Sequence, residues 1–93
     1  MAEIAVNITL SHDEVNEKIP YALICDVRYG HTWNNSKTQR EFEQKFTAEE
    51  REETEKIFRL AHKWHITSGV PNHVVMPVKT FMLWLRLAEF CAG

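Results

Sequence analysis

The sequence predicts a small, mainly α-helical domain, with a mixed α+β fold as the alternative. Three observations lead to this class. Residues 77–92 are apolar around most of a helical circumference, and residues 47–68 have the periodicity of a second, longer helix. Residues 3–10 alternate between apolar and polar side chains, as a half-buried strand does. Because 93 residues suffice for one hydrophobic core, we expect residues 1–93 to form a single domain.

The final helix, expected over residues 77–92, is the predicted centre of the core. Its sequence, PVKTFMLWLRLAEFCA, leaves only Lys79, Arg86 and Glu89 as charged positions. A helix with so little polar surface is normally buried by neighbouring elements or by a second copy of the chain. It is shorter than the roughly 20 apolar residues that span a bilayer. We therefore expect Trp84 and Leu87 to lie inside the protein.

The expected strand over residues 3–10 places four apolar side chains on one side: Ile4, Val6, Ile8 and Leu10. A strand that stands alone leaves its backbone hydrogen bonds unmade, so this strand needs a partner. That partner is either residues 74–76 or the same strand of a second protomer.

A helix is expected to begin after the strand, because Ser11 and Glu14 form a capping box. Apolar residues then recur at four-residue steps, which predicts one buried helical stripe made of Val15, Ile19, Leu23 and Val27. Pro20 would kink or split this helix, and Gly30 would end it. A strand over residues 21–29 is the competing interpretation, although three consecutive apolar residues there interrupt the alternation that a strand requires.

Residues 30–37 are rich in turn formers and predict a loop, which is followed by a short helix over residues 37–46. Trp33 has no apolar neighbours in this loop. An exposed Trp on a loop is a common anchor for a binding partner. Alternatively, the loop folds back and the indole covers the edge of the core.

The long helix, expected over residues 47–68, begins with a second capping box formed by Thr47 and Glu50. Its core-facing side chains are expected to be Ile57, Phe58, Leu60, Ala61 and Trp64. Gly69 ends the helix. The connector over residues 70–76 is short, which predicts that the long helix and the final helix are antiparallel neighbours.

Charge is segregated along the chain, although the net charge is only −2. Residues 41–55 carry seven Glu against Lys45 and Arg51, a balance of −5, whereas residues 56–93 have a balance of +4. Helical spacing predicts two ion pairs where these segments meet, Glu52 with Lys56 and Glu55 with Arg59. A net charge this small does not favour a dedicated nucleic-acid binder.

The chain shows no motif of a cofactor, metal or catalytic site, so we expect no cofactor, no metal and no enzymatic activity. His62 and His65 are three residues apart on the long helix, but no carboxylate or thiolate at a complementary spacing completes a metal site. Cys25 and Cys91 lie in apolar runs and are expected to be small buried residues. Three widely separated glycines do not form a phosphate-binding loop.

Two charged parts of the long helix are candidate binding sites. The crowded carboxylates at its start, Glu49, Glu52 and Glu53, are predicted to contact a basic surface of a protein partner, together with Trp33. The basic residues farther along, Lys56, Arg59 and Lys63, are the alternative site and would contact nucleic-acid phosphates. The solvated face of an ordinary amphipathic helix carries similar residues.

The N-terminus lacks the basic region of a secretory signal, so the expected location is the cytoplasm. Small size, segregated charge and a very apolar final helix favour a protein-binding module that acts as an inhibitor or regulator. We also expect a homodimer and no membrane association. Small inhibitors and regulators encoded by phages and mobile elements often have this profile. The alternatives are a small nucleic-acid-binding regulator and a protein that binds a metal or small ligand.

Overall fold

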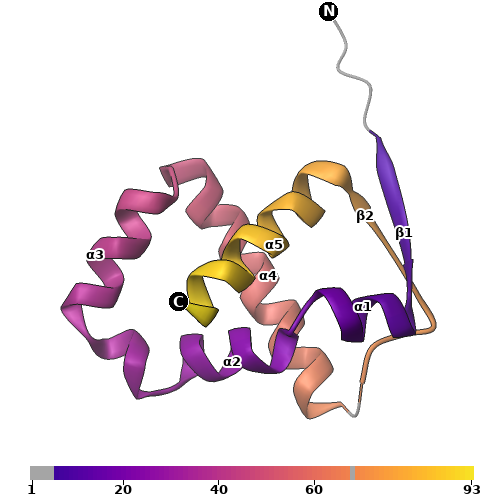
Figure 1. The fold of residues 1–93 in the computed structure, drawn as a ribbon, viewed down its shortest axis with the longest axis horizontal. Helices are drawn as coiled ribbons and strands as arrows, with labels where there is room; N and C mark the ends of the chain where they lie inside the picture. The colour runs from indigo at the N-terminus through magenta and orange to yellow at the C-terminus, as the bar shows by residue number, and fades with distance from the viewer. Residues whose placement is uncertain (1–5, 68) are drawn as a thin grey trace, which may run out of the picture.

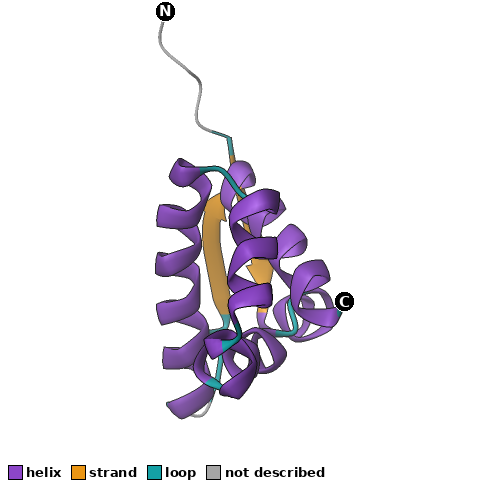
Figure 2. Cartoon of the chain, turned by 90° about the vertical axis from the view of Figure 1, so that its left-hand side faces the viewer, coloured by secondary structure: helices purple, strands orange, loops and turns teal. Residues whose placement is uncertain are grey.

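The computed structural model describes residues 6–67 and 69–93, which form five α-helices, one 3₁₀ helix and two strands. In chain order these are β1 (Asn7–Ser11), α1 (His12–Lys18), α2 (Tyr21–Tyr29), η1 (His31–Asn34), α3 (Ser36–Lys45), α4 (Ala48–Ile66), β2 (His73–Pro77) and α5 (Val78–Ala92). Figure 2 shows that helices make up most of the molecule and that the two strands run side by side. The predicted mainly α-helical fold is confirmed.

The two strands form an antiparallel sheet that joins the beginning of the chain to its last third. Thr9 of β1 lies opposite Val75 of β2, and Asn7 lies opposite Pro77. The predicted strand therefore pairs within its own chain. Its first expected residues, 3–5, lie outside the described part of the chain, and the strand ends at Ser11. Part of the expected connector over residues 70–76 is strand β2.

Both predicted capping boxes are present. The backbone N–H of Glu14 donates to Ser11 Oγ over 3.2 Å at the start of α1, and the backbone N–H of Glu50 donates to Thr47 Oγ1 over 3.2 Å before α4. Each cap satisfies backbone donors that the first helical turn leaves unpaired. The capping residues were therefore sufficient to locate the beginnings of these two helices.

The predicted stripe over residues 12–29 is partly wrong. Helix replaces the alternative strand over residues 21–29, but Ile19 and Pro20 are not helical and separate α1 from α2. The second helix therefore starts in a new rotational position, and residues four apart across the break no longer share a face. Ile24 is fully buried in α2, whereas Leu23 is 37% exposed.

The core lies where α2, α4 and α5 pack together. Trp84 and Leu87 of α5 are buried as predicted, and the Trp84 ring stacks on Trp64 of α4 with centroids 5.4 Å apart. The predicted contact between the long helix and the final helix is thus confirmed. Figure 1 shows that these two helices cross, so their contact is not an alignment along their full lengths. Cys91 is half-buried rather than fully buried.

Candidate protein-binding surface

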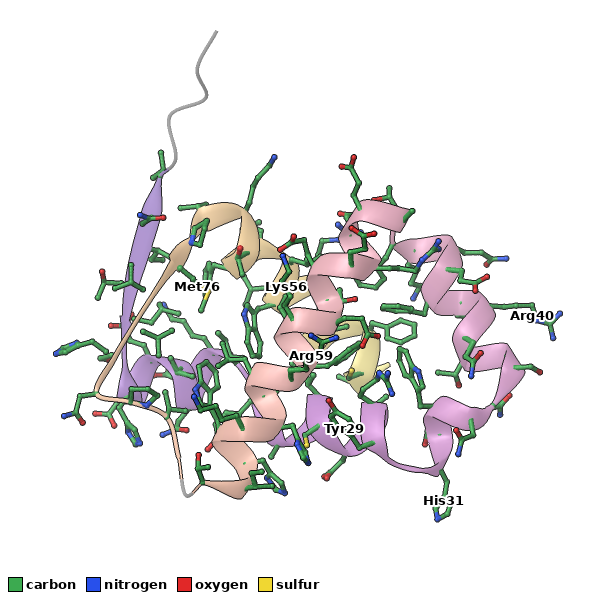
Figure 3. All side chains as sticks on the ribbon, turned by 180° about the vertical axis from the view of Figure 1, so that it is seen from behind. Tyr29, His31, Arg40, Lys56, Arg59 and Met76 are labelled. Atoms are coloured by element: carbon green, nitrogen blue, oxygen red, sulfur yellow. The ribbon has the colours of Figure 1, made fainter. Side chains whose placement is uncertain are left out.

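The outer face of α4 carries all six charged residues singled out by the sequence. Apart from the adjacent Glu52 and Glu53, they follow one another at three or four residues, which places them on one side of the helix: Glu49, Glu52, Glu53, Lys56, Arg59 and Lys63. All six are exposed, whereas Thr54, Phe58 and Ala61 are fully buried. Figure 3 shows Lys56 and Arg59 on the side of α4 turned towards the viewer. The face is acidic in the first half of the helix and basic in the second.

The two ion pairs predicted along α4 are wrong. Lys56 Nζ lies 3.3 Å from Oε1 of Glu53, which is one residue closer in sequence than the expected partner Glu52. Glu55 Oε2 lies 3.4 Å from Nη2 of Arg28 on α2. Glu55 lies on the flank of α4 that contacts α2, so a tertiary partner replaces the local one. Among the described residues, Glu52 and Arg59 have no ion-pair partner, nor do Glu49 and Lys63.

The Glu50 carboxylate forms a contact between two helices of the fold. Arg86 of α5 donates to Glu50 Oε2, and the same guanidinium donates to the backbone carbonyl of Lys45 over 2.7 Å. The hydrogen bond from the Thr47 backbone N–H is the main cause that lowers the pKa of Glu50, and Arg86 adds to it. This carboxylate therefore fixes α4 to α5 and is not available to a partner.

Trp33 belongs to η1 and packs against the edge of the core. Its ring centroid lies 4.9 Å from that of Phe42 and 5.3 Å from that of Phe58, both in edge-to-face geometry. The side chain is half-buried. Since η1 turns the expected loop back onto α3 and α4, this packing favours the interpretation in which the indole covers the core edge. Because the side chain is still partly exposed, its role as a binding anchor stays a prediction.

The Arg28 guanidinium packs against the rings of this aromatic cluster. Its guanidinium lies 5.1 Å from the Trp33 ring centroid, 5.5 Å from that of Phe58 and 5.4 Å from that of Tyr29. Such contacts between a cation and an aromatic face are attractive, and Glu55 balances the charge. Arg28 Nε is buried without a hydrogen-bond partner in the described part of the chain. The arrangement therefore depends on ring stacking more than on a complete set of hydrogen bonds.

Two histidines and one thiol lie around a small hollow between α2 and α4. His62 and His65 line it with Cys25, Asp26 and Tyr29, and its volume is about 240 Å³. Across residues 6–67 and 69–93, no group of three His, Cys, Asp or Glu side chains is placed to hold a metal ion. Burial, helped by Asp26, raises the pKa of the Cys25 thiol, and burial raises the pKa of Cys91 to about 11. Both thiols are therefore protonated at neutral pH and are weak nucleophiles.

A groove of about 350 Å³ between α4 and β2 is a feature that the sequence analysis missed. One wall is a stripe along the last turns of α4 and its C-cap: Leu60, Lys63, Trp64 and the capping residue Thr67. The other wall consists of consecutive β2 residues: His73, Val74 and Val75. Because consecutive strand side chains point to opposite faces, a hollow lined by all three runs along the edge of the strand. Gly69 and Pro71 line the groove where the chain turns from α4 to β2.

The hydrogen bonds that flank the sheet show which backbone groups point to its two open edges. The Val78 N–H donates to the Val6 carbonyl over 2.9 Å, and the His12 N–H donates to the Asn72 carbonyl over 3.0 Å. Bonded and non-bonded pairs alternate in an antiparallel ladder, so the facing residues Thr9 and Val75 do not bond each other. Their N–H and carbonyl groups point away from the sheet, Thr9 to one edge and Val75 to the other.

Comparison with protein-family models, with curated proteins and with solved structures finds no match to this chain. Among the described helices, none is both long and apolar enough to cross a membrane. The geometry above is therefore the basis for a functional proposal.

Proposed function

We propose that the protein is a cytosolic protein-binding module, an inhibitor or regulator without enzymatic activity, whose acidic half of α4 contacts a basic surface of its partner. The observation that carries the proposal is the separation of the α4 carboxylates into two groups. Glu50 and Glu55 are paired with arginines of other helices, whereas Glu49 and Glu52 face solvent without an ion-pair partner in the described residues. Exposed carboxylates on one rigid helix attract a basic partner over a distance.

The free thiols of Cys25 and Cys91 support the cytosolic part of this proposal. Cys25 and Cys91 are not joined in a disulfide. A small protein in an oxidising compartment commonly relies on disulfides for stability, whereas cytosolic thiols stay reduced. The folded core here forms around aromatic and aliphatic side chains without a covalent crosslink.

Reversing Glu49, Glu52 and Glu53 to Lys should slow association with the partner by about tenfold or more at low ionic strength and weaken its salt dependence. The partner is first captured by crosslinking in the source cell, and association is then measured by surface plasmon resonance. The matched control reverses three exposed carboxylates on other helices, Glu17, Asp26 and Glu89. Its association rate should stay much closer to that of the parent.

An equal loss in both triple variants would contradict the proposal, because net charge alone would then explain the binding. Circular dichroism melts check that each variant is folded. A captured partner that is a nucleic acid, bound through Lys56, Arg59 and Lys63, would also contradict it. The nearby carboxylates of Glu49 and Glu52 on the same helix face make that alternative the weaker one, since they repel phosphates.

The proposal includes a homodimer joined through β1. No residue between Val6 and Ser11 is charged and none is proline, although natural proteins usually protect an exposed strand edge by such residues. Figure 1 shows β1 at the outer margin of the molecule. In α5, by contrast, most apolar side chains are already packed against the core. Antiparallel pairing about a two-fold axis would place Thr9 opposite Thr9 of the second copy.

Thr9→Pro should convert the dimer into a monomer, because it removes a backbone N–H that points to the open edge of β1 while sparing the bonds to β2. The matched control is Val75→Pro, which places proline at the facing position of the same sheet but affects the other edge. Light scattering at high protein concentration should give a dimer for the parent and for Val75→Pro. A monomeric parent protein would contradict the homodimer.

A further inference from the structure

The free edge of β2 carries unpaired backbone groups that can form hydrogen bonds with a further strand. The N–H and carbonyl groups of His73 and Val75 point away from β1, as the alternation of the ladder requires. No hydrogen bond within residues 6–67 and 69–93 reaches these groups. Pro71 and Pro77 lie on either side, and Pro77 has no N–H to offer. The usable edge is therefore short and centred on His73 and Val75.

The groove beside this edge supplies side-chain contacts that an open edge alone would lack. Leu60 and Trp64 of α4 give it an apolar wall, and Val74 adds to it from β2. A strand lying between a helix and a sheet edge can thus form backbone bonds on one side and bury alternate side chains on the other.

The charges around the groove favour an acidic occupant. Lys63 and His73 line it, and no Asp or Glu does. Lys63 is exposed and has no ion-pair partner among the described residues. A carboxylate placed beside Lys63 would therefore gain a charge-assisted contact without displacing an existing one.

We propose that the groove between α4 and β2 binds an extended, acidic segment of a partner protein, which adds to the sheet as a third strand beside β2. Its backbone pairs with His73 and Val75, its apolar side chains contact Leu60 and Trp64, and its carboxylates face Lys63. The two flanking prolines limit this pairing to a few residues. The site is separate from the acidic half of α4 and goes beyond the function proposed above, since its ligand carries the opposite charge.

The test is a selection of eight-residue peptides with blocked ends from a random display library against the full chain. Enriched peptides should alternate apolar residues with Asp or Glu. Synthetic copies should bind Val75→Pro at least about tenfold more weakly than the parent, because an edge donor is lost. Thr9→Pro should leave their affinity nearly unchanged, since it alters the opposite edge.

Two charge variants keep the test informative even if Val75→Pro fails to fold. Lys63→Glu should weaken peptide binding, whereas Lys56→Glu, on the same helix but outside the groove, should not. The Glu49, Glu52 and Glu53 reversal should leave peptide binding intact, so failure of this inference is distinguishable from failure of the proposed function. Absence of any enriched peptide, or binding that survives both Val75→Pro and Lys63→Glu, would overturn the proposal.

Discussion

Replacing Leu87 with Ala should lower the free energy of unfolding by about 2–5 kcal/mol. Leu87 has no exposed side-chain surface and lies in the core where α5 packs against its neighbours. Removing its buried carbons leaves a cavity that the surrounding core side chains cannot fill without moving. A domain of this size is stabilised by only about 5–15 kcal/mol, so the loss is a large fraction of the total.

Urea denaturation followed by circular dichroism measures this change. The control is Met82→Ala on the same helix, because Met82 is 52% exposed and should matter far less. An unchanged unfolding midpoint for Leu87→Ala, or an equal loss for both variants, would show that α5 does not use this face to form the core.

Trp33→Ala should destabilise the domain by about 2 kcal/mol, less than a fully buried Trp would because the side chain is half-buried. Two edge-to-face contacts are lost, and Arg28 loses one of the rings that it covers. Trp33→Phe keeps an aromatic ring in place and should recover part of the stability. Thermal melts compare the three proteins.

The outcome for Trp33 also separates the two interpretations of its role. If Trp33→Ala has the same melting temperature as the parent and yet loses affinity for a partner, the indole is a binding anchor. Its packing against Phe42 then does not contribute to stability. If stability falls and Trp33→Phe restores it, the indole is part of the core edge. The binding surface then consists of the α4 carboxylates without this residue.

Helix starts were predictable because capping is a local property. Ser11 with Glu14, and Thr47 with Glu50, act within one turn, so four residues of sequence contain the whole interaction. The burial of Leu87 was predictable for a related reason. When most positions around a helix are apolar, the rotation of the helix hardly matters to whether a given residue is buried.

Features that depend on rotation or on distant residues were not predictable. The break at Pro20 was expected, but the new orientation of α2 after it was not, so Leu23 was assigned to the core in place of Ile24. The pairing of Glu55 with Arg28 needs α2 and α4 to be placed side by side first. Trp33 had no apolar neighbours in sequence, because its contacts come from α3 and α4.

The two candidate binding surfaces also differ in how far the sequence predicts them. The shared face of Glu49, Glu52 and Lys63 follows from helical spacing alone. The groove beside β2 does not, because it requires both the strand pairing and the position of α4 relative to it. Residues 74–76 could be suggested as a strand from the sequence, but nothing in their pattern shows which edge stays open.

The pairing of β1 with β2 also has a consequence during synthesis. Asn7 and its partner Pro77 are 70 residues apart, so the ribosome makes β1 long before β2 exists. At about 5–20 residues per second, this interval lasts roughly 4–14 s. Until β2 is made, both edges of β1 are unpaired. Most of α5, which contributes Trp84 and Leu87 to the core, is made later still. The core therefore forms only after α5 has been made, and the open β1 edge is most vulnerable to wrong pairing during those seconds.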